Sequence, residues 1–113
     1  MGKFQTSEEH PGRWHRPVCV PIGKGDVFGS ALEMVEDLPG WSVQSVDKEG
    51  LSATCVRNNG PLRGTSTIVV TVEGPDGIPN SQTHCCSESS GGLFSRDKAN
   101  VSEFTRKFWM RMT

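Results

Sequence analysis

The first strongly patterned stretch of the chain has apolar residues at the spacing of an α-helix. They recur at intervals of three and four positions: Phe28, Ala31, Leu32, Val35 and Leu38. This spacing places them on one face, so the pattern predicts a helix over 26–38 that buries that face. Asp26 is expected to cap its N-terminus, and Pro39 with Gly40 is expected to end it.

A second helix is predicted at the C-terminal end of the chain. Its apolar face repeats these intervals and is broadened by an indole ring: Val101, Phe104, Phe108, Trp109 and Met112. Asn100 is expected to open this helix, because Glu103 follows three residues later in a capping-box arrangement. The C-terminal helix therefore offers one apolar face to the rest of the fold.

Strands are predicted between the two helices, over 41–46, 51–57, 65–73 and 81–87. The stretch 65–73 is the clearest, because its β-branched residues alternate with a period of two. A shorter apolar piece over 18–22, with Pro17 and Pro21, is at best an edge strand. Short polar turns join the four main strands, which implies antiparallel hairpins.

These elements predict an α+β domain with an antiparallel sheet of four or five strands and both helices packed on one face. A sheet with one apolar face must cover it, and two helices with apolar faces are available to do so. The domain is expected to span residues 17–113. Residues 1–16 contain Pro and Gly without a period, so they are expected to form a flexible arm or to lie across the body.

Composition and charge narrow the function classes. The chain has 113 residues and 12.3 kDa, which is enough for one domain. Its 12 basic and 13 acidic residues leave a net charge of −1, so the positive field that broad nucleic-acid binding requires is absent. The longest apolar run, Ile68–Val70, is far shorter than the ~20 residues of a membrane-spanning helix. No secretory signal is recognised, so a cytoplasmic location is expected, although a form cut from a longer precursor would look the same.

The cysteines are the first candidates for chemistry: Cys19, Cys55, Cys85 and Cys86. They lack the paired spacing of a zinc site, so we expect no metal and no cofactor and interpret them as buried thiols. A disulfide between strands is disfavoured by the expected cytoplasmic location. One enzymatic hypothesis stays open, because His84 and Cys86 share a face of their strand: Cys86 is a candidate nucleophile with His84 as its base. The glycines at 91–92 are candidate oxyanion donors.

Aromatic side chains are the candidates for a binding site: Trp41, Phe104, Phe108 and Trp109. If the sheet curves away from the helices, the space between them can hold a small apolar ligand or lipid that these rings contact. Phe94 lies in the loop before the last helix. A second alternative uses the outer side of that helix against a partner or an anionic membrane surface, through Arg106, Lys107, Trp109 and Arg111.

Several short motifs along residues 17–109 suggest a relationship to a known family. They are Ala31-Leu32, Gly40-Trp41, Gly50-Leu51-Ser52-Ala53, the strand 65–72, Ser87-Glu88-Ser89, and Asn100 with Phe104. In order and type this set resembles the bacterial and plastid domain-of-unknown-function family 1499. The chain departs from that pattern at Gly64-Thr65-Ser66, where typical members have an aspartate pair, and before the last helix, where only Ser95 and Asn100 match. Because the family has no assigned activity, the resemblance implies an order of elements and no function.

The sequence therefore favours a non-enzymatic binding or interaction module, since no recognisable catalytic set stands apart from the fold. Its expected ligand is a small apolar molecule, or its expected partner a protein. The alternative is a thiol-dependent enzyme that uses Cys86 with His84, in which case Cys86 should react rapidly with electrophiles near neutral pH.

Overall fold

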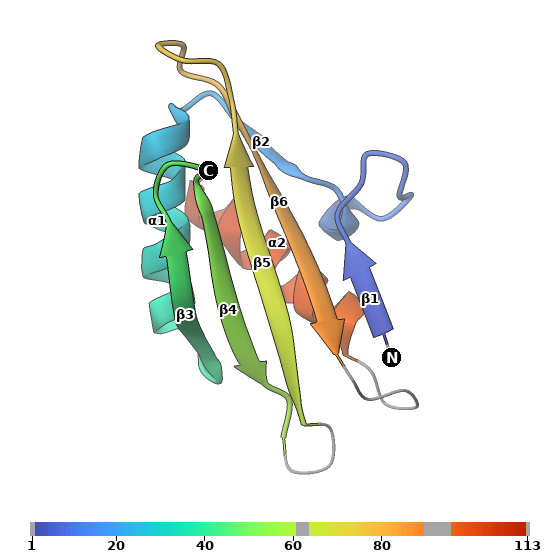
Figure 1. The fold of residues 1–113 in the computed structure, drawn as a ribbon. Coiled ribbons are helices and arrows are strands. Elements are labelled where there is room, and N and C mark those ends of the chain that lie inside the picture. Colours follow the sequence, from blue (N-terminus) through green and yellow to red (C-terminus); the bar gives the residue numbers. More distant parts are fainter. Residues whose placement is uncertain (1, 61–63, 90–95, 113) are drawn as a thin grey trace.

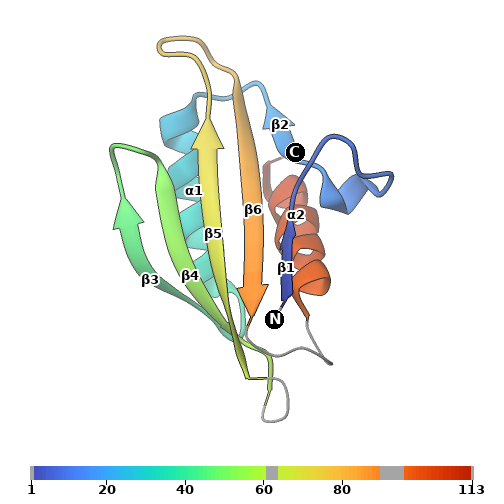
Figure 2. The same cartoon turned by 45° about the vertical axis from the view of Figure 1, so that its right-hand side comes forward.

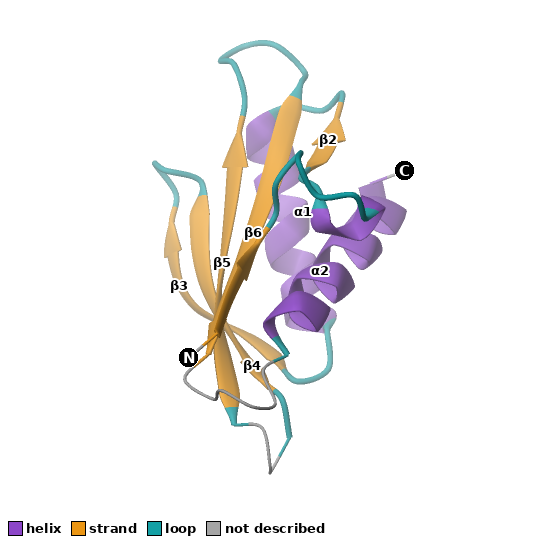
Figure 3. Cartoon of the chain, turned by 90° about the vertical axis from the view of Figure 1, so that its right-hand side faces the viewer, coloured by secondary structure: helices purple, strands orange, loops and turns teal. Residues whose placement is uncertain are grey.

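A sheet and two helices make up the fold, which the computed structural model describes for residues 2–60, 64–89 and 96–112. In chain order the elements are β1 (Gly2–Gln5), η1 (Arg13–His15), β2 (Val18–Val20), α1 (Lys24–Asp37), β3 (Trp41–Asp47), β4 (Ser52–Asn58), β5 (Thr65–Glu73), β6 (Ser81–Ser89) and α2 (Asp97–Met112). Both helices lie on the same side of the sheet, as the edge-on view in Figure 3 shows. The predicted α+β class, an antiparallel sheet with two helices, is confirmed.

Four consecutive strands form the centre of the sheet as an antiparallel meander (Figure 1). The spatial order β3–β4–β5–β6 follows the chain, and Val70 of β5 lies opposite Cys85 of β6. In β3 the register against β4 shifts between Val43 and Ser45. The predicted strand 65–73 matches β5 in its bounds, and the other three differ from β3, β4 and β6 only at their ends.

The far edge of the sheet is built by two short strands that both pair with β6. β1 lies antiparallel to residues 86–89 and β2 to residues 81–83. Between them the chain leaves the sheet over residues 6–17 and forms η1 beside α2 (Figure 2). β1 brings the sheet to six strands over the described residues, and the sequence did not predict it, because residues 1–16 show no alternating pattern.

The core lies between the sheet and the two helices. Alternate residues of β5 face it, so Ile68 and Val70 are buried, whereas Val69 on the opposite face is exposed. From α2, the rings of Phe104 and Phe108 stack with centroids 5.5 Å apart, and both are at most 1% exposed. Each such side chain stabilises the fold by about 1.5–3 kcal/mol through burial, which fixes the helices on this face.

Both helices begin earlier than the sequence predicts. α1 begins at Lys24 with Gly23 as its N-cap, so the prediction of Asp26 as the cap is wrong; Asp26 lies inside the first turn, where a carboxylate still favours the helix dipole. α2 begins at Asp97, so Asn100 lies within the helix and the predicted capping box is also wrong. The capping box of α2 does not form because both of its side chains bond outside the helix. The Asn100 amide donates to Ser87, and the Glu103 carboxylate accepts from Trp41.

Candidate functional site

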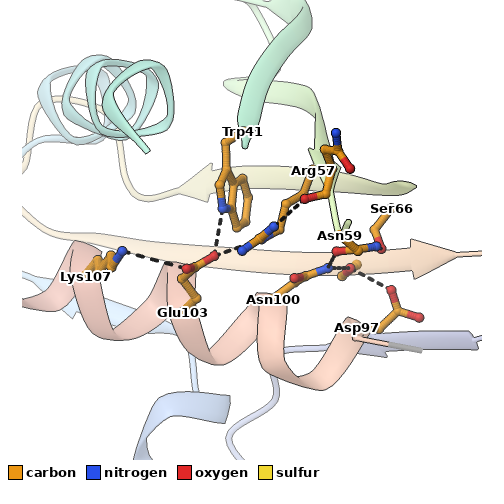
Figure 4. A network of polar contacts seen from close by, with 10 residues as sticks. Trp41, Arg57, Asn59, Ser66, Asp97, Asn100, Glu103 and Lys107 are labelled. Carbon is orange, nitrogen blue, oxygen red and sulfur yellow. Dashed lines mark hydrogen bonds and ion pairs between the residues drawn. The ribbon is translucent and has the colours of Figure 1, made fainter. Parts of the chain in front are cut away.

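The start of α2 carries a group of buried polar side chains, part of which Figure 4 shows. We call it the Asp97 cluster, and its members are Asn59, Ser66, Ser87, Ser89, Asp97 and Asn100. Asp97 is 3% exposed, and its carboxylate accepts hydrogen bonds from Ser87 Oγ at 2.7 Å and Ser89 Oγ at 2.9 Å. Asn100 Nδ2 donates to Ser87 Oγ and to Asn59 Oδ1, both at 3.3 Å. Asn59 Nδ2 in turn donates to Ser66 Oγ at 2.8 Å.

The Asp97 cluster ties the first turn of α2 to strands β5 and β6. A carboxylate removed from water needs donors, and two serine hydroxyls supply them. Three of the six motifs that carry the family resemblance contribute to the cluster, through Ser66, through Ser87 with Ser89, and through Asn100. None of the six residues of the cluster lines either of the two pockets described below. We therefore interpret the cluster as an anchor of the helix.

One turn further along α2, Glu103 joins the helix to β3 and β4 (Figure 4). Its Oε1 accepts hydrogen bonds from Trp41 Nε1 at 2.8 Å and from Arg57 Nε at 3.0 Å, and its Oε2 lies 3.7 Å from Lys107 Nζ. Burial alone raises the pKa of Glu103. The hydrogen bonds from Trp41 and Arg57 and the charges of Arg57 and Lys107 outweigh burial, so the net shift is downward. The ionised carboxylate thus fixes the Trp41 indole against α2.

The aromatic residues predicted to contact a ligand fall into two groups. Trp41, Phe104 and Phe108 belong to the core, with exposed fractions of 6%, 1% and 0%. Here they contact one another, with Trp41 and Phe104 ring centroids 6.2 Å apart, and their role as ligand contacts stays a prediction. Trp109 is only half-buried and lines a pocket on another side of α2. Phe94 lies outside the described residues.

This pocket lies between η1, β2 and the C-terminal half of α2, and we call it the tryptophan pocket. It has a volume of about 180 Å³ and is lined by Arg13, Trp14, Arg16, Pro17, Val18, Thr105 and Trp109. Two indole rings and a proline make its walls largely apolar. Val18 and Thr105, each 2% exposed, are its most deeply buried lining residues and form its floor.

Arg13 bridges the two indole rings of the tryptophan pocket. Its guanidinium carbon lies 4.8 Å from the ring centroid of Trp14 and 5.0 Å from that of Trp109. Cation–π contacts at exposed sites contribute about 0.5–1 kcal/mol, so Arg13 helps to hold the rings at the pocket. Within the described residues, its side chain makes no hydrogen bond and no ion pair.

A buried hydroxyl lines the same pocket. Thr105 Oγ1 has no hydrogen-bond partner within the described part of the chain. Leaving a buried hydroxyl unpaired costs about 1–3 kcal/mol, and a ligand group that forms a hydrogen bond with it recovers part of this free energy. Thr105 therefore brings a buried, unsatisfied hydroxyl to the residues that line the pocket.

Local contacts hold the arm in the position that creates the pocket. The ring of Phe4 stacks on His10 at 4.8 Å and meets the edge of His15 at 5.0 Å between centroids. Arg16 Nε donates to the carbonyl oxygen of His10 at 2.8 Å. The His15 amide donates to the carbonyl of Gly12, which closes η1. The arm is thus folded against itself as well as against α2.

Of the seven residues that line this pocket, sequence reasoning predicted Trp109 as a ligand contact and missed the other six. Arg13 and Trp14 lie in the arm, where no hydrophobic period draws attention to them, and Thr105 adjoins the apolar face of the last helix without chemistry of its own. The one available signal was Trp14, a large apolar ring in an otherwise polar segment.

The thiol-enzyme hypothesis places its residues on the opposite face of the sheet. His84 and Cys86 line a pocket of about 380 Å³ together with Glu73 and Thr6. His84 Nε2 lies 3.8 Å from Glu73 Oε2, and its Nδ1 lies 3.4 Å from Thr6 Oγ1. Burial raises the pKa of Cys86, and the positive charge of Lys3 does not offset this shift. A raised pKa keeps the thiol protonated at neutral pH, whereas a nucleophile needs the thiolate.

Three other candidates from the sequence remain: the oxyanion donors, a metal site and the basic residues of the last helix. The glycines at 91–92, proposed as oxyanion donors, lie outside the described residues. No group of three metal-ligating side chains lies together in residues 2–60, 64–89 and 96–112. On the outer side of α2, Lys107 pairs with Glu103 and Arg111 with Glu33, while Arg106 is exposed. Neither helix that the structure describes is long and apolar enough to cross a membrane.

The chain folds into an antiparallel sheet that carries both helices on one face, with the longer helix last. The chain is similar to the crystal structure of Ara h 8.0201, with a TM-score of 0.57 and 9% sequence identity. The superposition covers 98% of this chain and 94% of that chain. At this identity the likeness shows the fold alone. No model of a protein family and no curated protein matches the sequence.

Proposed function

We propose that the protein is a small binding module whose ligand occupies the tryptophan pocket. The ligand is a small apolar molecule that contacts the indoles of Trp14 and Trp109 and accepts or donates a hydrogen bond at Thr105. The observation that carries this proposal is the pocket with aromatic walls, at whose floor lies Thr105, a residue 2% exposed whose buried hydroxyl has no partner among the described residues.

The size of the pocket limits the ligand. An apolar cavity of about 150 Å³ is large enough to bind benzene. The tryptophan pocket, at about 180 Å³, therefore accommodates one aromatic ring or a short aliphatic chain, and any larger part of the ligand extends into solvent. A ligand of about ten non-hydrogen atoms at about 0.5 kcal/mol each binds with a Kd of about 0.1–1 mM.

The fold is compatible with this function. The Bet v 1-like architecture of the similar solved structure suggests a ligand-binding role without catalysis. The interior between sheet and helices is a less suitable place in this chain, because Phe104 and Phe108 fill it. We also keep the resemblance to the domain-of-unknown-function family 1499 as a hypothesis.

The thiol-enzyme alternative stays a prediction, and one observation counts against it. The shared face of His84 and Cys86 is as expected, since both line one pocket. The raised pKa of Cys86, however, is the reverse of what an activated nucleophile requires.

Thermal unfolding of the full chain with a panel of small compounds tests the proposal. Indole, benzyl alcohol, phenylacetate and hexanoate are suitable probes, because each combines one ring or short chain with a polar group. A ligand at ten times its Kd stabilises the native state by about 1.4 kcal/mol. For a domain of this size that raises Tm by several degrees.

Three variants locate the effect. Trp14→Ala and Thr105→Val are expected to abolish the rise in Tm caused by the best compound. Ile78→Ala, at an exposed apolar residue in the loop between β5 and β6, is the matched control and is expected to respond like the wild type. The proposal fails if no compound raises Tm, or if Trp14→Ala responds as the wild type does.

A further inference from the structure

Arg13 places a positive charge at the tryptophan pocket, and no carboxylate of the described residues pairs with it. The guanidinium carbon lies over the rings of Trp14 and Trp109. Within the described residues the guanidinium makes no hydrogen bond, so its N–H donors are available. Among the described residues, ion pairs of arginine are made by Arg57 and Arg111, both away from this pocket.

Other basic groups surround the same place. Arg16 lines the pocket, and its Nε is held by the carbonyl oxygen of His10, a contact that leaves its charge unneutralised. Burial lowers the pKa of His15, and the positive charge of nearby Lys98 lowers it further, so that at neutral pH Lys98 adds to the positive charge here and His15 does not. The pocket therefore combines apolar walls with a positive potential, which attracts an anionic group.

We propose that the ligand of the tryptophan pocket is a small apolar monocarboxylate whose carboxylate binds Arg13. This inference rests on the proposed function and adds the charge of the ligand. The apolar part of the ligand lies against Trp14 and Trp109. Its carboxylate accepts two parallel N–H···O bonds from the in-plane donors of Arg13, the geometry in which guanidinium and carboxylate bind most strongly.

A single carboxylate fits this site better than a phosphate or a polyanion. Arg13 presents one set of free donors among the described residues, while Arg16 already donates to a backbone carbonyl. The apolar walls also favour a ligand with one small charged end, because a dianion loses more hydration on entering them.

Phenylacetate and phenylacetamide form the probe pair, since they share the ring and the shape and differ in charge. Isothermal titration calorimetry of the full chain at low ionic strength measures both. Phenylacetate is expected to bind about five- to tenfold more tightly than the amide. The preference is expected to shrink in about 1 M salt, where charges are screened over about 3 Å.

Two arginine variants assign the preference to a residue. Arg13→Gln is expected to abolish the preference for phenylacetate, so that the variant binds the acid and the amide with equal affinity. Arg111→Gln is the control, because Arg111 lies on α2 outside the pocket and pairs with Glu33, and it is expected to keep the preference.

The outcomes separate this inference from the function on which it rests. If the amide binds as tightly as the acid, the carboxylate inference is wrong and the apolar site stands. If neither probe binds, the proposed function fails. If Arg13→Gln loses both probes while its circular dichroism spectrum is unchanged, Arg13 only holds the indole rings, which also overturns the inference.

Discussion

The two ends of α2 meet the rest of the molecule in opposite ways. At its start, the Asp97 carboxylate accepts hydrogen bonds from two serine hydroxyls of β6 and is closed off from solvent. Towards its other end, α2 lines a pocket with Thr105, next to Arg13 of η1, and the buried Thr105 hydroxyl and the Arg13 guanidinium have no such partners among the described residues. A polar group whose bonds are made within the chain serves the fold, whereas one left unpaired at a pocket is available to a ligand.

The largest expected effect is the difference in lost unfolding free energy between removing Phe108 and removing its neighbour Trp109 on α2. Phe108 is fully buried and stacks on Phe104, so Phe108→Ala is expected to destabilise the protein by about 3–5 kcal/mol. Trp109→Ala is expected to cost about 1 kcal/mol, because its half-buried ring borders a pocket. Urea unfolding followed by far-ultraviolet circular dichroism measures both. Equal losses would show that Trp109 belongs to the core and would remove the contrast between the two regions.

The next prediction tests the start of α2, where the Asp97 carboxylate is buried. Asp97→Ala leaves the hydroxyls of Ser87 and Ser89 buried without their acceptor, so a loss of about 2–3 kcal/mol in unfolding free energy is expected. Asp26→Ala is the matched control, because Asp26 also occupies a first helical turn but is exposed. Its expected loss is the helix-dipole contribution of about 0.3–1 kcal/mol. Similar losses in the two variants would contradict the anchoring role of the Asp97 cluster.

Between the two ends, Glu103 makes the attachment of α2 dependent on pH. Its folded-state pKa is lowered from the ordinary value of 4.5, so the ionised form stabilises the native state at neutral pH. This contribution, about 1 kcal/mol, is fully present above the unfolded-state pKa and is lost as the pH falls through the lower folded-state value.

Comparison with Glu103→Gln measures that contribution. The wild type is expected to exceed the variant in unfolding free energy at neutral pH, and the difference is expected to shrink as the pH falls below 4.5. Because Gln keeps an acceptor for Trp41 and Arg57, the variant isolates the charge. A difference that grows on acidification would contradict the downward shift.

The smallest expected effect concerns the thiols on the opposite face of the sheet. Cys86 is expected to react slowly with iodoacetamide near neutral pH, because its pKa is raised by burial. Exposed Cys19 is expected to react first, and buried Cys55 and Cys85 last. His84→Ala is expected to leave the Cys86 rate unchanged. Rapid labelling of Cys86 that His84→Ala slows would instead support the thiol-enzyme hypothesis.

Most of the fold was predictable because its main elements carry strong local patterns. The alternation along β5 and the apolar faces of both helices require no knowledge of distant residues. β1 was not predictable, since Gly2–Gln5 is short and polar and becomes a strand only through pairing with β6. The start of α2 was misplaced because Asn100 resembles a cap in sequence but bonds to β6 and to Asn59.

The candidate site was predictable only in part. The aromatic content of α2 pointed to Trp109 as a ligand contact, and Trp109 lines the tryptophan pocket. Its partners Arg13 and Trp14 lie at the other end of the chain and come close only after the arm folds around Phe4 and His10. Local periodicity carries no information about such a contact.

The central claim is that ligand binds beside Trp14 and Trp109 and not inside the core beside Trp41. The indole N–H resonances of these three residues in a ¹H–¹⁵N correlation spectrum report this location directly during a titration with phenylacetate. The Trp14 and Trp109 signals are expected to shift together, while that of Trp41, whose N–H donates to Glu103, stays in place. A shift of the Trp41 signal with the other two unmoved would contradict the account and place the ligand between the sheet and the helices.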